Sequence, residues 1–423
     1  MQNNNKPFQI DKHLIYQSWL SVKENHGAAG IDKMDIETVN KDYKTLLYKL
    51  WNRMSSGSYM ASPIKKVAIP KNDGKGSVRI LGIPTVLDRV AQTAVVKLLE
   101  PRLDPKFDQD SYGYRPNKSA HDALAQARGR CLKIPYVIDL DIKGFFDNIP
   151  HDKLMEIVEE FVPEIWIKLY IKRWLTANMQ DFKGNITERT KGLSQGGAIS
   201  PLLANSYLDV VFDKWMRSEF ARIPFERYAD DIIVHCSTLK QAQYILDRIK
   251  ERMRDYGLEI HPDKTKIVYC NKEQRRQAQP QGIDNKFDFL GYGFKTRSTV
   301  NKLTGEMINT FTPAISDKAK TKIKDVIRSL KIYNYTSCSE KDLAKMLKSK
   351  ITGWINYYGK FRKSELYEVF AVLNNAIVKW IKKKYKIVSI KTAYQKFEEL
   401  KRAKTFAHFI LLPQMVNATG RAG

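Results

Sequence analysis

Cysteine and long apolar runs are both scarce in this sequence. Its 423 residues include four cysteines, which lie far apart and without the spacing of zinc ligands: Cys131, Cys236, Cys270 and Cys338. We therefore expect ordinary thiols rather than a disulfide framework or a zinc site. No stretch approaches the ~18 consecutive apolar residues of a transmembrane helix, and the polar residues 1–6 lack the apolar core of a signal peptide. These absences predict a cytoplasmic protein with no membrane as partner.

Acidic residues are few relative to basic ones. The 46 Asp and Glu face 72 Lys and Arg, which gives a formal net charge of +26 at pH 7. A surplus of this size repels itself unless a polyanion is close, so nucleic acid is the expected partner. An anionic membrane is the alternative. Hydrophobic residues make up 43% of the chain, which is enough for a folded core and excludes wholesale disorder.

The middle of the chain has the pattern of a sheet with helices. We expect, in chain order, a strand at 136–141, helices at 151–161 and from 200, two strands at 225–236 around a tight turn at 229–231, a helix from 238 to 257, and strands at 258–260 and 265–269. Ser200 is expected to be an N-cap, with Pro201 at the first helical position. Thr238 with Gln241 predicts a capping box. This order suits a split βαβ, ferredoxin-like sheet.

Polar segments and helical stripes complete the pattern. Loops are expected at 71–77, 181–197 and 271–285. From about residue 313, apolar residues recur at helical spacing in three segments: 323–330, 343–358 and 366–380. The polar faces of these expected helices are rich in lysine, which usually indicates only a solvated face. The net charge of the chain favours nucleic-acid contact instead.

Two adjacent carboxylates mark the expected turn between the strands of 225–236. Asp230 and Asp231 follow Tyr228-Ala229, and Asp141 ends a separate strand. A solvated turn is the ordinary explanation of an Asp-Asp pair. The apolar flanks of this hairpin favour a metal site, since adjacent acids repel each other and Mg²⁺ prefers carboxylate oxygen. Two such ions about 4 Å apart activate a 3′-hydroxyl and stabilise leaving pyrophosphate.

Eight blocks, in order from about 27 to 360, resemble the reverse transcriptases encoded by group II introns. The blocks are Gly27–Asp32, Arg79–Arg89, Ser111–Pro116, Leu140–Asp147, Leu193–Leu208, Tyr228–Asp231, Phe289–Gly293 and Gly353–Tyr358. The fourth and sixth resemble the catalytic blocks of that family, and the last resembles its thumb, or maturase, signature. Ser194 departs from the proline that often precedes Gln195 in the family.

The resemblance implies a metal site and a sugar-sensing residue. Asp141 and Asp230 would ligate two Mg²⁺ ions, with Mn²⁺ as a possible substitute, and Asp231 would complete the acidic set. The backbone carbonyl of Ile142 would also bind metal. Phe146 would lie beneath the sugar and clash with a ribose 2′-hydroxyl; a plain core aromatic is the alternative.

The resemblance also implies contacts to the incoming nucleotide. Arg79 and Lys71 would bind the triphosphate, Arg through a planar fork and Lys as a point charge, unless both are solvated loop charges. Gln195 would lie over the nucleotide, with Gly196 allowing close backbone approach; an ordinary turn is the alternative. Lys264 would protonate the departing pyrophosphate, unless it is a plain surface lysine.

Three aromatic residues have implied roles beyond the catalytic blocks. Tyr292 would brace the primer end, with sheet packing as the alternative. Trp354 and Tyr358 lie on an apolar stripe, so we expect them to pack the thumb core. The chain has no Cys- and His-bearing nuclease segment of the kind that many relatives append, so we do not expect it to nick a target.

The expected fold class is α+β. It is that of a right-hand polymerase with fingers, a palm built on a ferredoxin-like antiparallel sheet, and an α-helical thumb. The expected domains are fingers at 1–130, palm at 131–305, thumb or maturase domain at 306–390, and a short basic tail at 391–423.

The expected function is RNA-directed DNA synthesis by a group II intron-type reverse transcriptase. The expected partners are an RNA template, a DNA primer, their RNA–DNA hybrid, dNTPs and a structured intron or other non-coding RNA, with a second role as a maturase. One alternative is a domesticated relative in antiphage defence or DNA repair. Another is an RNA-binding splicing chaperone that does not polymerise.

Overall fold

The computed structural model of the protein describes residues 6–70, 78–270, 282–300 and 304–412. The chain divides into two compact units. The first unit comprises Met1–Ala123 and Ile138–Lys266, and the second comprises Leu124–Val137 and Ile267–Gly423. The expected boundaries near 130, 305 and 390 stay a prediction.

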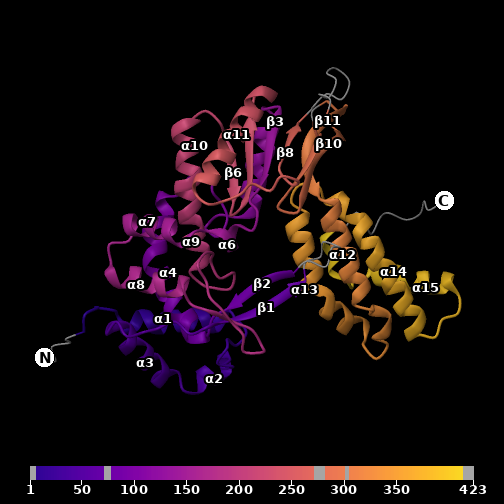
Figure 1. Ribbon diagram of the computed structural model, residues 1–423. Coiled ribbons are helices and arrows are strands. Elements are labelled where there is room, and N and C mark those ends of the chain that lie inside the picture. Colours follow the sequence, from indigo (N-terminus) through magenta and orange to yellow (C-terminus); the bar gives the residue numbers. More distant parts are fainter. Residues whose placement is uncertain (1–5, 71–77, 271–281, 301–303, 413–423) are drawn as a thin grey trace. The chain divides into compact units, whose positions relative to one another are not determined.

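The first unit combines helices with strands of two sheets, one of which continues into the second unit (Figure 1). Its helices are α1 (Lys12–Glu24), α2 (Ile36–Lys41), α3 (Tyr43–Ser55), α4 (Val86–Leu103), α6 (Phe145–Asn148), α7 (His151–Phe161), α8 (Ile165–Leu175), α9 (Ser200–Leu208), α10 (Lys214–Glu219) and α11 (Leu239–Asp255), with a 3₁₀ turn at Asp104–Lys106 and a π-helical turn at Asp209–Asp213. The boundary between the units falls within α5 (Ala120–Cys131).

One sheet has the strand order β6-β7-β3-β8. Its strands are β3 (Tyr136–Asp141), β6 (Phe225–Tyr228), β7 (Asp231–Cys236) and β8 (Lys266–Tyr269). The predicted strand at 136–141 and the predicted hairpin at 225–236 are confirmed. The strand expected at 258–260 is wrong, because Ile260 forms only an isolated bridge with Ile142. Helix α11 packs against β7, which gives this sheet the mixed helical and antiparallel character of the expected α+β class.

Of the two helix caps predicted near this sheet, the Thr238 cap is present and the Ser200 cap is not. Thr238 caps α11 by accepting a hydrogen bond from the N–H of Gln241 at 3.1 Å, as expected. The Gln241 side chain accepts from the N–H of Ser237 instead of from the cap residue. Ser200 is not an N-cap: it is the first residue of α9, because Ile199 before it is already helical at φ −84° and ψ −19°.

The second sheet of the first unit has the order β2-β1-β4-β5. Its strands are β1 (Ile64–Pro70), β2 (Val78–Ile83), β4 (Met179–Gln180) and β5 (Ile186–Thr187). Strands β1 and β2 are antiparallel and pair Ile69 with Arg79. The segment expected as a loop at 181–197 thus contains a short strand. The loop expected at 71–77 lies outside the described residues, as do 271–281 of the loop expected at 271–285.

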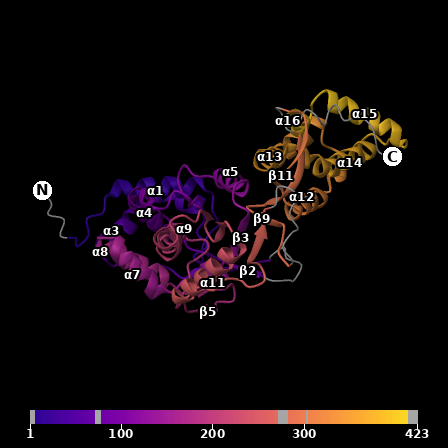
Figure 2. The ribbon, with the colours of Figure 1, turned by 90° about the horizontal axis from the view of Figure 1, so that it is seen from above.

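The second unit joins a three-stranded sheet to a helical bundle. The strand order is β11-β10-β9, all antiparallel. Its elements are β9 (Lys286–Phe289), β10 (Tyr292–Val300), β11 (Met307–Ile315), α12 (Asp317–Ser329), α13 (Glu340–Tyr358), α14 (Tyr367–Lys384), α15 (Ile390–Arg402) and α16 (Ala407–Leu411), with 3₁₀ turns at Ile332–Asn334 and Lys363–Leu366. Figure 2 shows α13, α14, α15 and α16 gathered together.

The three helical stripes predicted after residue 313 are confirmed as α12, α13 and α14. Their buried faces form one hydrophobic cluster, which includes Ile323, Leu347 and Trp380. Residues 393–412 contribute to the same cluster through Phe397 and Phe409 of α15 and α16, so this part of the expected tail is packed. Ser339 and Asp342 form a full capping box at the start of α13.

The fold bears on the expectations about disulfides and membrane-spanning helices. Within the described part of the chain, no disulfide joins any of the four cysteines. Among the described residues, no helix combines the length and the apolar character that crossing a membrane requires.

Candidate active site

The three carboxylates expected to act together all lie in the first unit. Asp230 is in the turn between β6 and β7, Asp231 begins β7, and Asp141 ends β3. Loss of solvation, together with the negative charge of Asp141, raises the pKa of Asp230. Loss of solvation, then the charges of Asp230 and Asp141, raise the pKa of Asp231 to about 7, although this residue keeps access to solvent. The three acids therefore share one electrostatic site.

Asp141 is held by the segment that follows α11. Its N–H donates to Oγ1 of Thr265 at 3.2 Å, and its carbonyl accepts from the N–H of His261 at 2.8 Å. The Lys264 ammonium donates to both carboxylate oxygens of Asp141, at 3.0 and 3.1 Å. The Lys264 side chain is 58% exposed, so its ammonium can leave this ion pair without losing a packed position.

The predicted metal site consists of Asp141, Asp230, Asp231 and the Ile142 carbonyl. Within 6–70, 78–270, 282–300 and 304–412, no group of three or more His, Cys, Asp or Glu side chains could hold a metal ion as it stands. Lys264 occupies both oxygens of Asp141. The donor chemistry fits a divalent cation, because carboxylate oxygens are hard ligands. Burial first, and neighbouring carboxylates after it, raise the pKa values of Asp230 and Asp231. The roles of these acids and of the Ile142 carbonyl stay predictions.

A basic strand and a tyrosine lie within electrostatic reach of Asp230. The positive charge of Arg79, on β2, lowers the pKa of Asp230 against the effect of burial. Partial burial and the charge of Asp230 raise the pKa of Tyr114, while Arg79 lowers it. In the sequence analysis Tyr114 appears only as part of the block Ser111–Pro116. Its electrostatic interaction with Asp230 and Arg79 adds it to the candidate site. Lys71 lies outside the described residues.

The loop with Gln195 is packed against β2. A Cβ on Gly196 would lie 2.3 Å from the carbonyl oxygen of Gly82, so only glycine fits there. Ser194 is buried, and its hydroxyl donates to the same oxygen at 2.8 Å. The Ser194 departure from the family pattern is therefore accommodated by a hydrogen bond. Nε2 of Gln195 donates to Oδ1 of Asp147 at 3.2 Å, and this bond links the loop to α6.

Phe146 lies beside this loop. Its carbonyl oxygen accepts from the N–H of Leu193 at 2.6 Å. The ring of Phe145 is buried in the core and meets the ring of Phe146 edge to face, with the centroids 5.5 Å apart. Phe146 itself is only half-buried. The core-aromatic alternative therefore describes Phe145 better than Phe146.

The three aromatic residues with implied roles beyond the catalytic blocks belong to the second unit. Tyr292 is fully buried, and its hydroxyl donates to the carbonyl oxygen of Tyr357. Tyr292 therefore packs within its unit, in line with the alternative of sheet packing, and a role in bracing the primer end stays a prediction. Trp354 and Tyr358 are partly buried against the helical cluster, as expected for packing residues.

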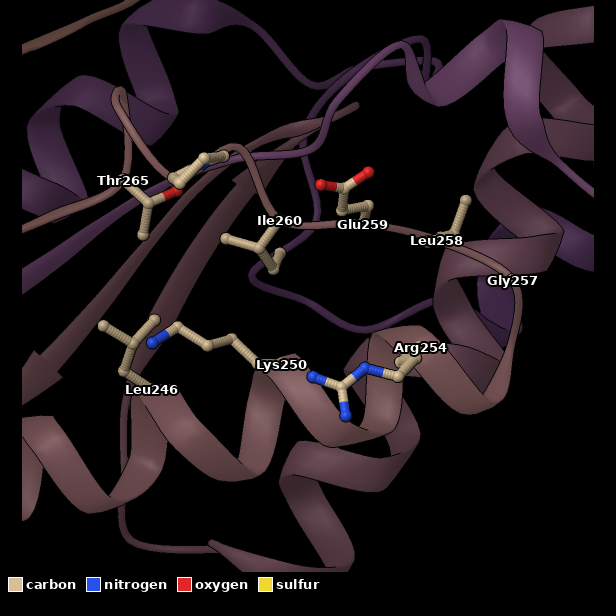
Figure 3. Close-up of a pocket in the computed structure, with 9 residues that line it drawn as sticks. Leu246, Lys250, Arg254, Gly257, Leu258, Glu259, Ile260 and Thr265 are labelled. Carbon is tan, nitrogen blue, oxygen red and sulfur yellow. The ribbon is translucent and has the colours of Figure 1, made fainter.

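A groove of about 680 Å³ lies between α11 and the segment that holds Asp141 (Figure 3). Lys250 and Arg254 reach into it from α11, and Ile260 and Thr265 line the opposite side. Thr265, which lines the groove, also contacts Asp141: its hydroxyl oxygen accepts the hydrogen bond from the Asp141 N–H. Lys250 also pairs with Asp247 at 3.0 Å. The lining of the groove does not include Asp141, Asp230 or Asp231.

Two acids at a hairpin turn, a third on an adjacent strand and a nearby arginine form one cluster on an α+β scaffold. A family model described as reverse transcriptase (RNA-dependent DNA polymerase) matches residues 69–294, more than half of the 423 residues. The chain belongs to this family. A second model, the maturase-specific domain of group II introns, matches residues 320–397. The chain thus carries a reverse transcriptase domain followed by a maturase-type domain.

Individual relatives are intron-encoded or related proteins. The group II intron-encoded protein LtrA of Lactococcus lactis is 28% identical over 265 residues, which cover 62% of this chain and 42% of that protein. Protein YkfC of Escherichia coli is 28% identical and covers 60% of this chain and 75% of its own length. The chain therefore spans less than half the length of LtrA. A telomerase structure from Candida albicans aligns with a TM-score of 0.44 at 14% identity, covering 92% of this chain and 72% of that chain.

Proposed function

We propose that this chain is an RNA-directed DNA polymerase whose site is formed by Asp141, Asp230 and Asp231. The carboxylates and the Ile142 carbonyl would hold two divalent cations, Mg²⁺ by preference and Mn²⁺ as a substitute. Such ions, when bound, activate a primer 3′-hydroxyl and stabilise the leaving pyrophosphate. The observation that carries the proposal is the sheet order, in which β7, which begins at Asp231, neighbours β3, which ends at Asp141. Carboxylates gathered in this way suit a divalent cation.

The other residues of the site would bind and orient the nucleotide. Arg79 would bind triphosphate oxygens through its planar fork, with Lys71 as a second cation. Phe146 would contact the sugar and exclude a 2′-hydroxyl. Gln195 would cover the base pair, and Gly196 keeps its loop against β2. The Lys264 ammonium, released from Asp141, would donate a proton to pyrophosphate.

The substrates would be an RNA template, a DNA primer and dNTPs in the cytoplasm. The net charge of +26 supports binding to a polyanion. An RNA–DNA hybrid would be recognised by its A-form shape, its phosphates and its 2′-hydroxyls rather than by base edges.

Primer extension tests this proposal. The purified chain, an RNA template, an annealed DNA primer, dNTPs and Mg²⁺ should give DNA products that EDTA abolishes. Omitting the RNA template is the control for terminal addition. Retained RNA binding without extension would instead support a non-polymerising splicing chaperone.

A second role as a maturase has its own support in the match of residues 320–397 to the maturase-specific domain. The chain would bind a structured intron RNA and assist its splicing. The test adds the chain to a group II intron transcript at low Mg²⁺, with intron RNA flanking the gene as the first choice. Unchanged splicing, with extension activity intact, would favour the alternative of a relative used in defence or repair.

A further inference from the structure

The turn that carries Asp230 and Asp231 has a backbone conformation that its sequence does not favour. Tyr228 pairs with Asp231, so Ala229 and Asp230 are the two residues of a tight hairpin turn. Ala229 has a φ of +57°, and residues with a side chain reach the left-handed region only at about 1–2 kcal/mol. Glycine takes such a position freely. Contacts from the surroundings must therefore hold this turn.

Arg227 supplies the first of these contacts. Its Nη1 donates to the carbonyl oxygen of Ala229 at 3.4 Å and to Oδ1 of Asn205 at 3.0 Å. Its Nε donates to Oδ1 of Asp213 at 2.7 Å, and its Nη2 donates to the other oxygen of that carboxylate. The Arg227 and Asp213 side chains have no exposed area. One planar guanidinium thus joins the turn to α9 and to the π-helical turn.

Gly113 supplies the second contact, on the backbone of Ala229. A Cβ on Gly113 would lie 2.5 Å from the nitrogen of Ala229, so the segment must carry glycine to come this close. Nδ2 of Asn205 donates to the Gly113 carbonyl oxygen at 2.7 Å. The N–H of Arg227 donates to the carbonyl oxygen of Asp110 at 2.9 Å. Asn205 therefore ties Arg227 to the segment that packs on the turn.

Stability alone does not account for this arrangement. The attraction in a buried ion pair is offset by the loss of hydration, and apolar side chains of similar volume are often equally or more stabilising. Arginine differs from lysine here because its donors form a rigid fork in one plane. That fork can bind Asp213, Asn205 and Ala229 at fixed angles to one another, so the pair contributes geometry.

We propose that Arg227, held by Asp213 and Asn205, is a positioning residue that fixes the Ala229–Asp230 turn. It acts through the Ala229 carbonyl and directs the two acids of the turn toward their common site. This inference rests on the proposed polymerase function. A misplacement of about 1 Å in a catalytic group can lower a rate about a hundredfold, so loss of the fork has a measurable effect.

Arg227→Lys tests the inference, because it keeps the charge and removes the fork. In primer extension, kcat should fall about 10- to 100-fold, while KM for dNTP and Kd for the hybrid change less than about threefold. Mn²⁺ binding to the hybrid-free protein, measured by electron paramagnetic resonance, should weaken about tenfold, since its carboxylate ligands are misplaced. The melting temperature should change by only a few degrees.

Two further variants separate positioning from folding. Arg173 in α8 donates to the carbonyl oxygens of Gly57 and Tyr59, and Arg173→Lys should keep the parental kcat and Mn²⁺ affinity. Arg227→Met combined with Asp213→Leu replaces the buried pair by apolar side chains and should keep the melting temperature, with kcat still at least about tenfold down.

The outcomes are distinct. Parental kcat and Mn²⁺ affinity in Arg227→Lys, or recovery of kcat in the double variant, would overturn the positioning role. Failure of the parental chain to extend primers would overturn the proposed function instead, and the Mn²⁺ measurement would still report whether Arg227 positions the acids.

Discussion

The two units hold their functional elements in different ways. In the first unit ionisable side chains are buried in and beside the β6–β7 hairpin: Glu226, Arg227, Asp213 and His235 are all fully buried. In the second unit the helices share a hydrophobic cluster, and ion pairs such as Lys324–Glu368 lie at its surface. Apolar burial contributes most of the free energy of folding, whereas buried charge contributes position. The first unit is therefore built for placement of groups, and the second for packing.

The largest expected effect is loss of catalysis without loss of structure in the first unit. Asp230→Asn removes one charge from a set of mutually repelling acids, so the free energy of unfolding should be unchanged or higher. Primer extension should fall about ten thousandfold or more, about 5 kcal/mol in the activation barrier. Single-turnover kinetics and a thermal melt check both parts. A variant that extends primers at the parental rate would disprove the metal-ligand assignment.

The opposite result is expected for the helical cluster of the second unit. Phe370 is fully buried on α14, and Phe370→Ala should lower the free energy of unfolding by about 3–5 kcal/mol through lost burial and the cavity left behind. Urea unfolding followed by circular dichroism measures this change. Met346, 39% exposed on α13, provides the control, since Met346→Ala should change stability by less than about 1 kcal/mol. Equal effects of the two substitutions would contradict the packing model.

A pH effect is expected at the end of the same cluster. Burial lowers the pKa of His408 to about 3, and the ring accepts or donates a hydrogen bond with Asn374 at 2.8 Å. The unfolded chain takes up a proton near pH 6.5 and the folded chain does not, so stability is lost as the pH falls below 6.5. The loss should be about 1.4 kcal/mol per pH unit. His408→Gln should remove this slope in urea titrations between pH 6.5 and 5.5, and an unchanged slope would assign it to another group.

The smallest effect should come from a surface ion pair. Lys324 pairs with Glu368, whose side chain is 60% exposed. Lys324→Ala should change the free energy of unfolding by less than about 1 kcal/mol, because solvent screens exposed pairs. The change should vanish in 1 M salt. A loss above 2 kcal/mol would show that the second unit also depends on charge.

Local patterns explain which parts of the fold could be predicted from the sequence. The hairpin at 225–236, the strand that ends in Asp141 and the three helical stripes follow from residue periodicity over a few residues. The start of α9 could not be predicted in this way, because the turn ending at Ile199 already has helical angles before Ser200. Ile260 forms only an isolated bridge, and its partner Ile142 lies one residue beyond the end of β3.

The acidic residues of the candidate site could be predicted from the sequence, but the residues that hold their turn in place could not. Asp230 and Asp231 are adjacent, and an apolar hairpin with two acids is a local signal. Arg227 depends on Asn205 and Asp213, which approach it only in the folded chain. One signal was available: a charged pair, Glu226-Arg227, inside an otherwise apolar strand predicts buried partners.

Gly196 has a consequence for the nucleotide pocket. Its backbone lies against the carbonyl of Gly82, three residues beyond Arg79 on the same strand. In the proposed site, the wall that would cover the base pair and the wall that would bind phosphate are thereby packed against each other as one rigid piece. Widening the pocket for a bulkier nucleotide thus requires moving both walls at once, and single substitutions at residue 196 would only push them apart out of register.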